Sequence, residues 1–513
     1  MLLRSTVRDP AVGDDSSYVA SDRPSLPAVA RGPVLSAMAA VATVLTVFSD
    51  GYGYHRDELY FRMLRPDGGY VDQPPLGPLL TRLFSSVVAD EPWAIRLPAT
   101  AATVASVLVL ALITRELGGG RGAQMLCAWA YAFAALPLIM GHALLTSTLD
   151  MPVWPAVLLF VIRAQLRRQP QWWLAAGVVV GLSMYNKLLV AVLLVALAAG
   201  LALVGPRRVL WSKWVLGAAA LALVIGSPNI VYQVSHDWPQ LSMGRALANN
   251  NGAEVRATMW PFLLLMLGPP LVPIWVAGLI SLVRRREWRA VRFLAAAFPV
   301  LLALVFVMGS QFYYPFGLVA ALFAAGCVPT CEWIARAVRW RRLLVVAAVS
   351  LNAAVSAALG LPLVPQSALG DTPVPSVNQV AQDSVGWPTY VSQIAGVYAR
   401  LSPADRSRTV VVTSNYGEAG AVARYGTQFS LPAVYSAHNQ LYYDGRPPET
   451  ATMAILVGGQ LEEATTSFES CDVVDRLDNG LGVDNEEQGQ PVAICAGPRG
   501  GWVAVWPLLR HED

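Results

Sequence analysis

The chain has 513 residues, of which 55% are hydrophobic and only 14% are charged. Together with a mean hydropathy of +0.47, this composition excludes an ordinary soluble enzyme and predicts a polytopic α-helical membrane protein. The formal net charge of +3 is too small to indicate a nucleic-acid partner, so membrane lipid is the first partner expected.

The first 32 residues are polar and have no apolar period, which predicts a disordered cytoplasmic tail. Apolar stretches of about 17–23 residues follow, each long enough to cross a hydrocarbon core of ~30 Å. The run from Trp172 to Val204 is too long for one crossing, and Asn186-Lys187 divides it into two short helices. Eleven crossings are therefore expected, at residues 33–49, 97–114, 122–140, 151–166, 171–185, 188–204, 214–231, 260–282, 293–309, 314–331 and 343–361.

Positive residues gather in alternate connections between these stretches, as in Arg167-Arg168 and Arg284-Arg285-Arg286. Because cytoplasmic loops carry the excess of Lys and Arg, this pattern predicts a multi-pass protein of the plasma (inner) membrane with its N-terminus in the cytoplasm. Everything after Leu361 is then expected outside the cytoplasm.

Residues 362–513 are polar and Pro-rich, with short β-branched runs at 409–413, 433–435, 453–457 and 492–495. A helix candidate lies between the first two runs, which predicts a βαβ-like extracytoplasmic α/β domain. Cys471 and Cys495 both fall in this domain, where an oxidising compartment would allow a disulfide, although the sequence leaves the pairing open. No spacing of ligand residues resembles a zinc site.

The loop predicted over residues 50–96 contains the charged cluster Tyr54-His55-Arg56-Asp57-Glu58. An Asp at the centre of an inserted helix costs roughly 2.5–3.5 kcal/mol, so an Asp-Glu pair beside the membrane indicates a functional site. The alternation of aromatic and charged residues favours amphipathic helices along the interface, ending in the rigid turn Gln73-Pro74-Pro75. The alternative is an interfacial loop with an aromatic belt, which does not require Asp-Glu beside His.

These motifs resemble a known family. Asp57-Glu58, then Gly69-Tyr70-Val71-Asp72-Gln73-Pro74-Pro75-Leu76 and then Arg96-Leu97-Pro98 are similar to the first loop of GT-C glycosyltransferases of the protein O-mannosyltransferase and aminoarabinose transferase superfamily (family 39-like). The resemblance covers residues 33–361 as the catalytic membrane domain. It implies a hexosyl- or pentosyltransferase of the cell envelope that takes a sugar from a polyprenyl-phosphate donor on the external face. The sugar, for example mannose, arabinose, galactose or aminoarabinose, and the acceptor, whether protein, lipid or cell-wall glycan, stay open.

The resemblance also implies roles for the two carboxylates. Asp57 is the expected general base of an inverting transfer to a hydroxyl, a contribution typically worth about 10²–10⁴-fold in rate. Glu58 is expected to hold neighbouring groups or the acceptor, and the two roles could be exchanged. For Glu58, the alternative is an ion pair with Arg56 or Arg62.

A phosphate leaving group needs fixed cations or backbone donors in a partly dry site. Arg96 and Lys187 are best placed to supply them, although each could instead extend to lipid headgroups. Asp150 is expected to position the donor sugar or phosphate, with capping of the next helix as the alternative. His55, Gln73 and Tyr313 complete the expected donor site. No metal ligand is assigned, and the use of a divalent cation stays open.

Acceptor recognition is expected in the C-terminal domain, because α/β folds place ligand groups at the carboxyl ends of strands. Glu418, His438 and Asn439 follow the first two predicted strands. Residues 232–259, with Trp238 and three consecutive Asn, are expected to form a polar loop that closes over the substrate or serves as a long surface connection.

Two other classes of protein compete with a sugar transferase. A lipid-sugar transporter or flippase tends to show two corresponding halves, but this chain has no second copy of the Asp-Glu segment. A non-catalytic GT-C-like partner would not need the intact Asp57-Glu58 pair. Both alternatives stay open from the sequence alone.

Overall fold

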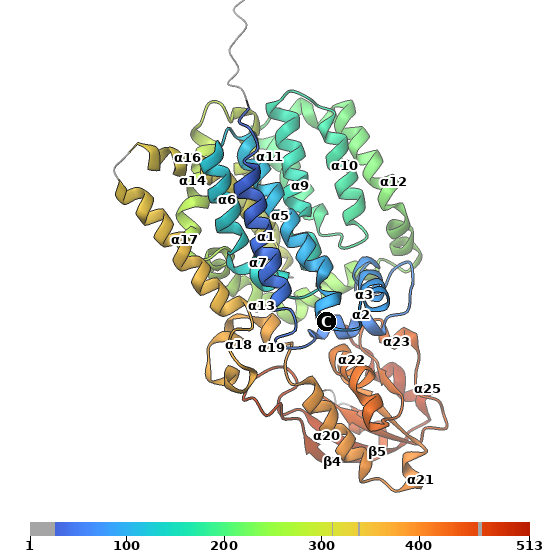
Figure 1. The fold of residues 1–513 in the computed structure, drawn as a ribbon. Helices are drawn as coiled ribbons and strands as arrows, with labels where there is room; N and C mark the ends of the chain where they lie inside the picture. The colour runs from blue at the N-terminus through green and yellow to red at the C-terminus, as the bar shows by residue number, and fades with distance from the viewer. Residues whose placement is uncertain (1–25, 310, 337–338, 460–463, 513) are drawn as a thin grey trace, which may run out of the picture.

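The computed structural model describes residues 26–309, 311–336, 339–459 and 464–512, so residues 1–25 of the predicted tail lie outside the described residues. Figure 1 shows a bundle of long helices with a smaller unit of helices and strands at one end. The first helix, α1 (Arg31–Val47), begins at the opposite end of the bundle and runs toward this smaller unit.

The bundle helices follow the apolar stretches of the sequence, and their buried faces form one continuous hydrophobic core. After α1 they are α5 (Leu97–Glu116), α6 (Arg121–Ala132), α7 (Ala135–Gly141), α8 (Thr146–Asp150), α9 (Val153–Leu166), α10 (Trp172–Ser183), α11 (Val190–Val204), α12 (Lys213–Ser235), α13 (Pro239–Leu265), α14 (Val272–Arg284), α15 (Phe293–Met308), α16 (Phe316–Ala335) and α17 (Arg339–Gly360). Among the described residues, six helices are long and apolar enough to cross a membrane, or up to eight if each bent pair is one span. The shorter apolar helices α1, α10 and α11 would complete the predicted set, and the number of crossings stays a prediction.

Two stretches predicted as single crossings are broken. Helices α6 and α7 meet at a bend of 51°, and the α13–α14 pair meets at 68°. At the second break, Gly268 has a φ of +99°, and a Cβ there would lie 1.9 Å from Oδ1 of Asn352, so only glycine fits. Hydropathy sums over a window of residues and does not detect such a bend.

The predicted polar loop over residues 232–259 is wrong. Helix α12 continues to Ser235 and α13 begins at Pro239, which leaves only a short turn at 236–238. Proline suits the first helical position because its φ is already helical. Asn249 and Asn250 lie on an exposed part of α13, where polar residues need no apolar partner.

The predicted first loop contains three short helices: α2 (Arg56–Met63), α3 (Leu76–Val87) and α4 (Pro92–Ile95). Figure 1 shows α2 and α3 between the bundle and the smaller unit. Helix α2 begins with a capping box, in which the His55 side chain accepts from the backbone N–H of Asp57 and the Glu58 side chain accepts from that of His55. The capping box therefore fixes where Asp57 emerges from the first turn.

The C-terminal unit is built on a five-stranded sheet in the order β2-β1-β3-β5-β4. Its strands are β1 (Thr409–Thr413), β2 (Val434–Ser436), β3 (Met453–Val457), β4 (Phe468–Arg476) and β5 (Pro491–Pro498). Its helices are α18 (Val374–Val377), α19 (Gln379–Gln382), α20 (Trp387–Ala399), α21 (Pro403–Arg406), α22 (Tyr416–Tyr425), α23 (Leu441–Asp444) and α25 (Trp502–Val505). Strand β1 pairs in parallel with β2 and β3, so β1, α22 and β2 form the predicted βαβ unit.

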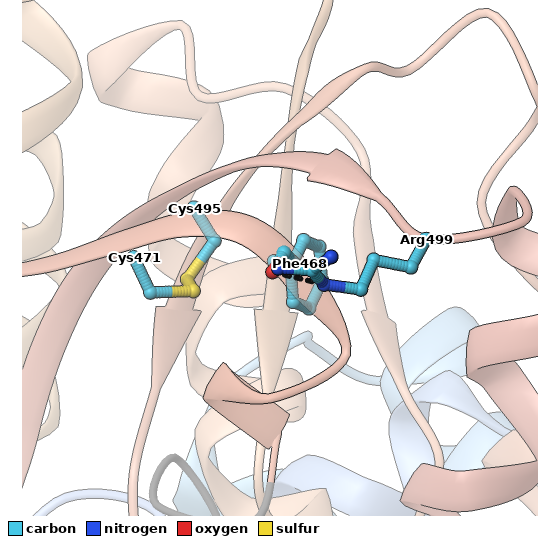
Figure 2. Close-up of a disulfide and its surroundings, with 4 residues drawn as sticks. All are labelled: Phe468, Cys471, Cys495 and Arg499. Atoms are coloured by element: carbon cyan, nitrogen blue, oxygen red, sulfur yellow. Dashed lines mark hydrogen bonds between the residues drawn. A yellow bond between two sulfur atoms is a disulfide. The ribbon is translucent and has the colours of Figure 1, made fainter.

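The edge strand β4 was not predicted, because polar residues interrupt its apolar ones and most of its side chains are exposed. Cys471 on β4 lies directly opposite Cys495 on β5, and the two form a disulfide with a Cα–Cα distance of 4.1 Å. Figure 2 shows this bond near Arg499, whose Nε donates to the backbone oxygen of Phe468 at 2.8 Å. The pairing that the sequence left open is thus present, and it ties the edge strand to the sheet.

Candidate functional site

A cavity of about 570 Å³ lies where the bundle, the first-loop helices and the C-terminal unit meet. Its polar lining comes from separate parts of the chain: α2 and the loop after it, the start of α8, the connections α10–α11, α12–α13 and α15–α16, and the C-terminal unit. The residues with polar side chains are Asp57, Tyr60, Asp72, Gln73, Thr146, Asn186, Lys187, Gln233, Trp238, Gln240, Gln311, Tyr313, Tyr314, Tyr416 and Asn439.

Asp57 lies on the wall of this cavity, in the first turn of α2. Its side chain is 29% exposed, and its Oδ1 accepts a hydrogen bond of 3.1 Å from the hydroxyl of Tyr416. A carboxylate that is partly desolvated, held on one oxygen and open to a cavity can accept a proton from a bound hydroxyl.

Glu58 has a different environment, because its side chain is fully buried and does not line the cavity. Its two oxygens accept from Nε and Nη2 of Arg96, each at 2.8 Å, and from the backbone N–H groups of His55 and Leu144. Glu58 therefore forms an ion pair with Arg96, whereas Arg56 pairs with Glu486 and Arg62 with Asp90. Contact of Glu58 with the acceptor stays a prediction that this placement does not support.

Arg96 is also buried, and its guanidinium donates to the backbone oxygens of Ser49 and Gly53 as well as to Glu58. All of these partners are internal, and Arg96 is not part of the cavity wall. The structure therefore does not place Arg96 at the cavity, and its binding of the donor phosphate stays a prediction. The motif Arg96-Leu97-Pro98 instead joins the start of α5 to the capping box of α2.

Lys187 lies in the break between α10 and α11, as the sequence predicted, and reaches the cavity. Its Nζ is 5.0 Å from the ring centre of Tyr314 and 5.7 Å from that of Tyr313. The neighbouring Asn186 donates from Nδ2 to the backbone oxygen of Thr146 at 2.8 Å, which fixes the turn. Lys187 is thus a cation held against two aromatic rings at the cavity wall.

Asp150 lines a second, much smaller cavity of about 30 Å³ together with Lys187 and Tyr313. Asp150 is the last residue of α8. The N-cap residue of α9 is Pro152, and no side chain there caps the helix, so the structure does not show Asp150 as a helix cap. Asp150 is close to the predicted donor residues but does not line the main cavity.

Of the other predicted donor residues, Gln73 and Tyr313 line the main cavity and His55 does not. The Nε2 of Gln73 is buried and has no hydrogen-bond partner among the described residues. His55 is buried at the start of α2, and burial lowers the pKa of its imidazole. Its side chain caps α2, and its role at the donor stays a prediction.

The predicted acceptor residues separate in the same way. Asn439 lines the main cavity, whereas Glu418 lies on a different polar cavity of about 130 Å³ inside the C-terminal unit. Glu418 belongs to the capping box of α22, and burial, reinforced by nearby Glu487, raises its pKa to about 8. His438 accepts from the backbone N–H of Tyr416 at 3.2 Å and stacks on the Tyr416 ring. Glu418 and His438 therefore support α22 and do not form the wall of the main cavity.

Comparison with known proteins agrees with this architecture. Residues 72–232 match the profile of the family described as dolichyl-phosphate-mannose-protein mannosyltransferase. A crystal structure of ArnT from Cupriavidus metallidurans bound to undecaprenyl phosphate is 16% identical, with a TM-score of 0.59 over 91% of this chain and 100% of ArnT. This chain has the GT-C fold.

The apo structure of the same ArnT gives a TM-score of 0.57 at 16% identity, over 92% of this GT-C chain and 100% of ArnT. The mycobacterial arabinofuranosyltransferase AftD gives a TM-score of 0.50 at 14% identity, over 92% of this chain and 40% of AftD. No curated protein sequence matches significantly. The resemblance expected from the first-loop motifs is therefore confirmed.

The cavity residues of this GT-C protein that were not assigned roles from the sequence include Asp72 and Tyr416. Asp72 was noted within the first-loop motif but given no function; Tyr60 donates to its Oδ1 at 3.1 Å, and burial raises its pKa to about 7. Tyr416 opens a helix of the C-terminal unit, and no local pattern in the sequence relates it to Asp57. Within the described part of the chain, no group of three or more His, Cys, Asp or Glu is arranged to hold a metal ion.

Proposed function

We propose that this GT-C protein is a membrane glycosyltransferase that moves a hexose or pentose from a polyprenyl-phosphate donor to a hydroxyl acceptor, with inversion. The observation that carries the proposal is that Asp57 and Lys187, a carboxylate and a cation from distant parts of the sequence, line one cavity. The fold shared with an ArnT structure that holds undecaprenyl phosphate supports a lipid-phosphate donor.

Lys187 is the proposed partner of the donor phosphate. As the sugar leaves, negative charge grows on the phosphate, and a fixed cation in a partly dry cavity stabilises that charge more strongly than water would. Gln73 would donate from its unpaired Nε2 to the same group or to the sugar. Leu188, Val192 and Leu241 give the cavity an apolar side that suits the first units of a polyprenyl chain.

Asp57 is the proposed general base. It takes the proton of the acceptor hydroxyl while that oxygen forms a bond to the anomeric carbon. In the same step the bond from this carbon to the phosphate oxygen breaks, and the electron pair leaves with the polyprenyl phosphate. A single displacement of this kind inverts the anomeric configuration. Asp57, not Glu58, fits this role because Glu58 is fully paired and buried.

The proposed reaction takes place on the extracytoplasmic side of the plasma membrane, with the N-terminus in the cytoplasm. The distribution of Arg between the connections supports this orientation. The disulfide between Cys471 and Cys495 also supports it, because disulfides persist mainly in oxidising compartments. The acceptor would be an envelope protein, lipid or glycan that reaches the cavity past Asn439.

The test uses membranes that contain the full chain and its native acceptor, supplied with labelled polyprenyl-phosphate mannose, arabinose, galactose or aminoarabinose. Transfer of label from one of these donors is expected, and Asp57→Asn should reduce it by about 10² or more. Asp67→Asn is the matched control, because Asp67 is exposed in the same loop and does not line the cavity.

Three outcomes would contradict the proposal. Equal transfer by the Asp57→Asn variant would exclude Asp57 as the base. Movement of the lipid-linked sugar across vesicles without release of polyprenyl phosphate would indicate a flippase. Consumption of none of the donors would favour a non-catalytic partner.

A further inference from the structure

The proposed base is held by a residue from the other structural unit. Tyr416 is the first residue of α22 and packs beside the sheet, yet its hydroxyl donates to Oδ1 of Asp57 at 3.1 Å across 359 positions of sequence. Both residues line the main cavity. The C-terminal unit, docked on α2, therefore completes the wall of the cavity beside Asp57.

The close approach of α22 to α2 is built into the packing of the two helices. At Gly420 a Cβ would lie 2.7 Å from the backbone carbon of Leu59, so any larger residue would push α22 away from α2. Helix α22 is also fixed at its start by the capping box between Asn415 and Glu418. The position of Tyr416 is thus set by backbone contacts and does not depend on a flexible loop.

The ring of Tyr416 is held on several sides. Its centre is 4.6 Å from the ring centre of Tyr60 and 4.9 Å from that of His438, and the guanidinium carbon of Arg56 lies 4.8 Å from it. The backbone N–H of Tyr416 donates to Nδ1 of His438. These contacts restrict the ring to an orientation in which its hydroxyl reaches Asp57.

The two oxygens of Asp57 have different surroundings. The hydrogen bond from Tyr416 is made to Oδ1, and Nδ1 of His55 lies 3.9 Å from the same atom. In the part of the chain that the structure describes, no donor bonds Oδ2. One oxygen is therefore anchored, and the other is left for a ligand in the cavity.

We propose that Tyr416 is a positioning residue for the transfer reaction: it anchors Oδ1 of Asp57 so that Oδ2 faces the acceptor hydroxyl. This inference rests on the proposed function and adds that the C-terminal unit completes the catalytic site. When Asp57 takes the proton at Oδ2, the hydrogen bond from Tyr416 to Oδ1 persists, so the carboxyl does not rotate during the step.

The test compares Tyr416→Phe with the unchanged full chain, using the labelled donor that the unchanged chain consumes. The Phe ring keeps the stacking contacts and removes only the hydroxyl. We expect kcat to fall roughly tenfold, because a hydrogen bond to a charged group is lost, while KM for the donor changes by less than about twofold. Tyr398→Phe is the matched control, because Tyr398 lies on α20 of the same unit and does not line the cavity.

A second variant separates positioning from a general effect on structure. In the Asp57→Asn background, Tyr416→Phe should cause little further loss, because Tyr416 acts through Asp57. Additive losses in the double variant would overturn the inference, and so would an unchanged kcat in Tyr416→Phe. Either result leaves the proposed function intact if the unchanged chain transfers sugar. Absence of transfer by the unchanged chain would instead contradict the proposed function itself.

Discussion

Replacing Arg96 with Met removes the cation from a carboxylate that has no access to solvent. Glu58 accepts two hydrogen bonds from Arg96 and two from backbone N–H groups, and both side chains of the pair are almost completely buried. Met has a similar length but no charge. The variant therefore leaves Glu58 with only its two backbone donors.

The magnitude follows from the burial. Removing one partner of a buried ion pair typically costs about 3–5 kcal/mol, because the remaining charge stays desolvated. Arg62 and Asp90 form an ion pair in the same region whose side chains are 18% and 46% exposed, and an exposed pair contributes only about 0–1 kcal/mol. Arg96→Met should thus lower the free energy of unfolding several times more than Arg62→Met does.

The assay is denaturant-induced unfolding of the detergent-solubilised full chain, followed by tryptophan fluorescence. Arg96→Met and Glu58→Gln should both shift the midpoint to lower denaturant. The double variant should be less destabilised than the sum of the two, because no unpaired charge remains. If Glu58→Gln were as stable as the unchanged chain but lost most of its sugar transfer, the structural role of Glu58 would be refuted and a role in the reaction would be favoured.

Three further predictions concern the donor site and the C-terminal unit. Lys187→Met should abolish protection of the protein against thermal unfolding by polyprenyl phosphate, because the phosphate loses its cation; protection equal to that of the unchanged chain would remove Lys187 from the donor site. Burial raises the pKa of Glu418 from its ordinary 4.5 to about 8, so the folded state keeps a proton that the unfolded state releases. The free energy of unfolding should then fall as pH rises between these two values. In Glu418→Gln the unfolding midpoint should decline less steeply with pH, and an unchanged slope would contradict the raised pKa of Glu418. The disulfide closes a loop with a sequence separation of 24, so the double variant Cys471→Ser, Cys495→Ser should lose about 3 kcal/mol of unfolding free energy. The loss should appear as faster proteolysis of the C-terminal unit, whereas Cys331→Ser, at a free cysteine, should have little effect.

The sequence by itself predicted the features that depend on local pattern. Long apolar stretches predicted the helical bundle, because an apolar helix must avoid water whatever it packs against. The polar pair Asn186-Lys187 predicted the break between α10 and α11, and short β-branched runs with a helix candidate between them predicted the βαβ unit. Strand β4 was not predicted, because an exposed edge strand carries many polar side chains and has no continuous apolar run.

The roles of adjacent residues were decided only by the tertiary structure. Asp57 and Glu58 are neighbours in sequence, but the turn of α2 directs one to the cavity and buries the other against Arg96. The contact between Asp57 and Tyr416 depends on α22 packing closely on α2 at Gly420. A motif determines which chemical groups are present, whereas packing between distant segments determines which of them meet a substrate and which hold the fold together.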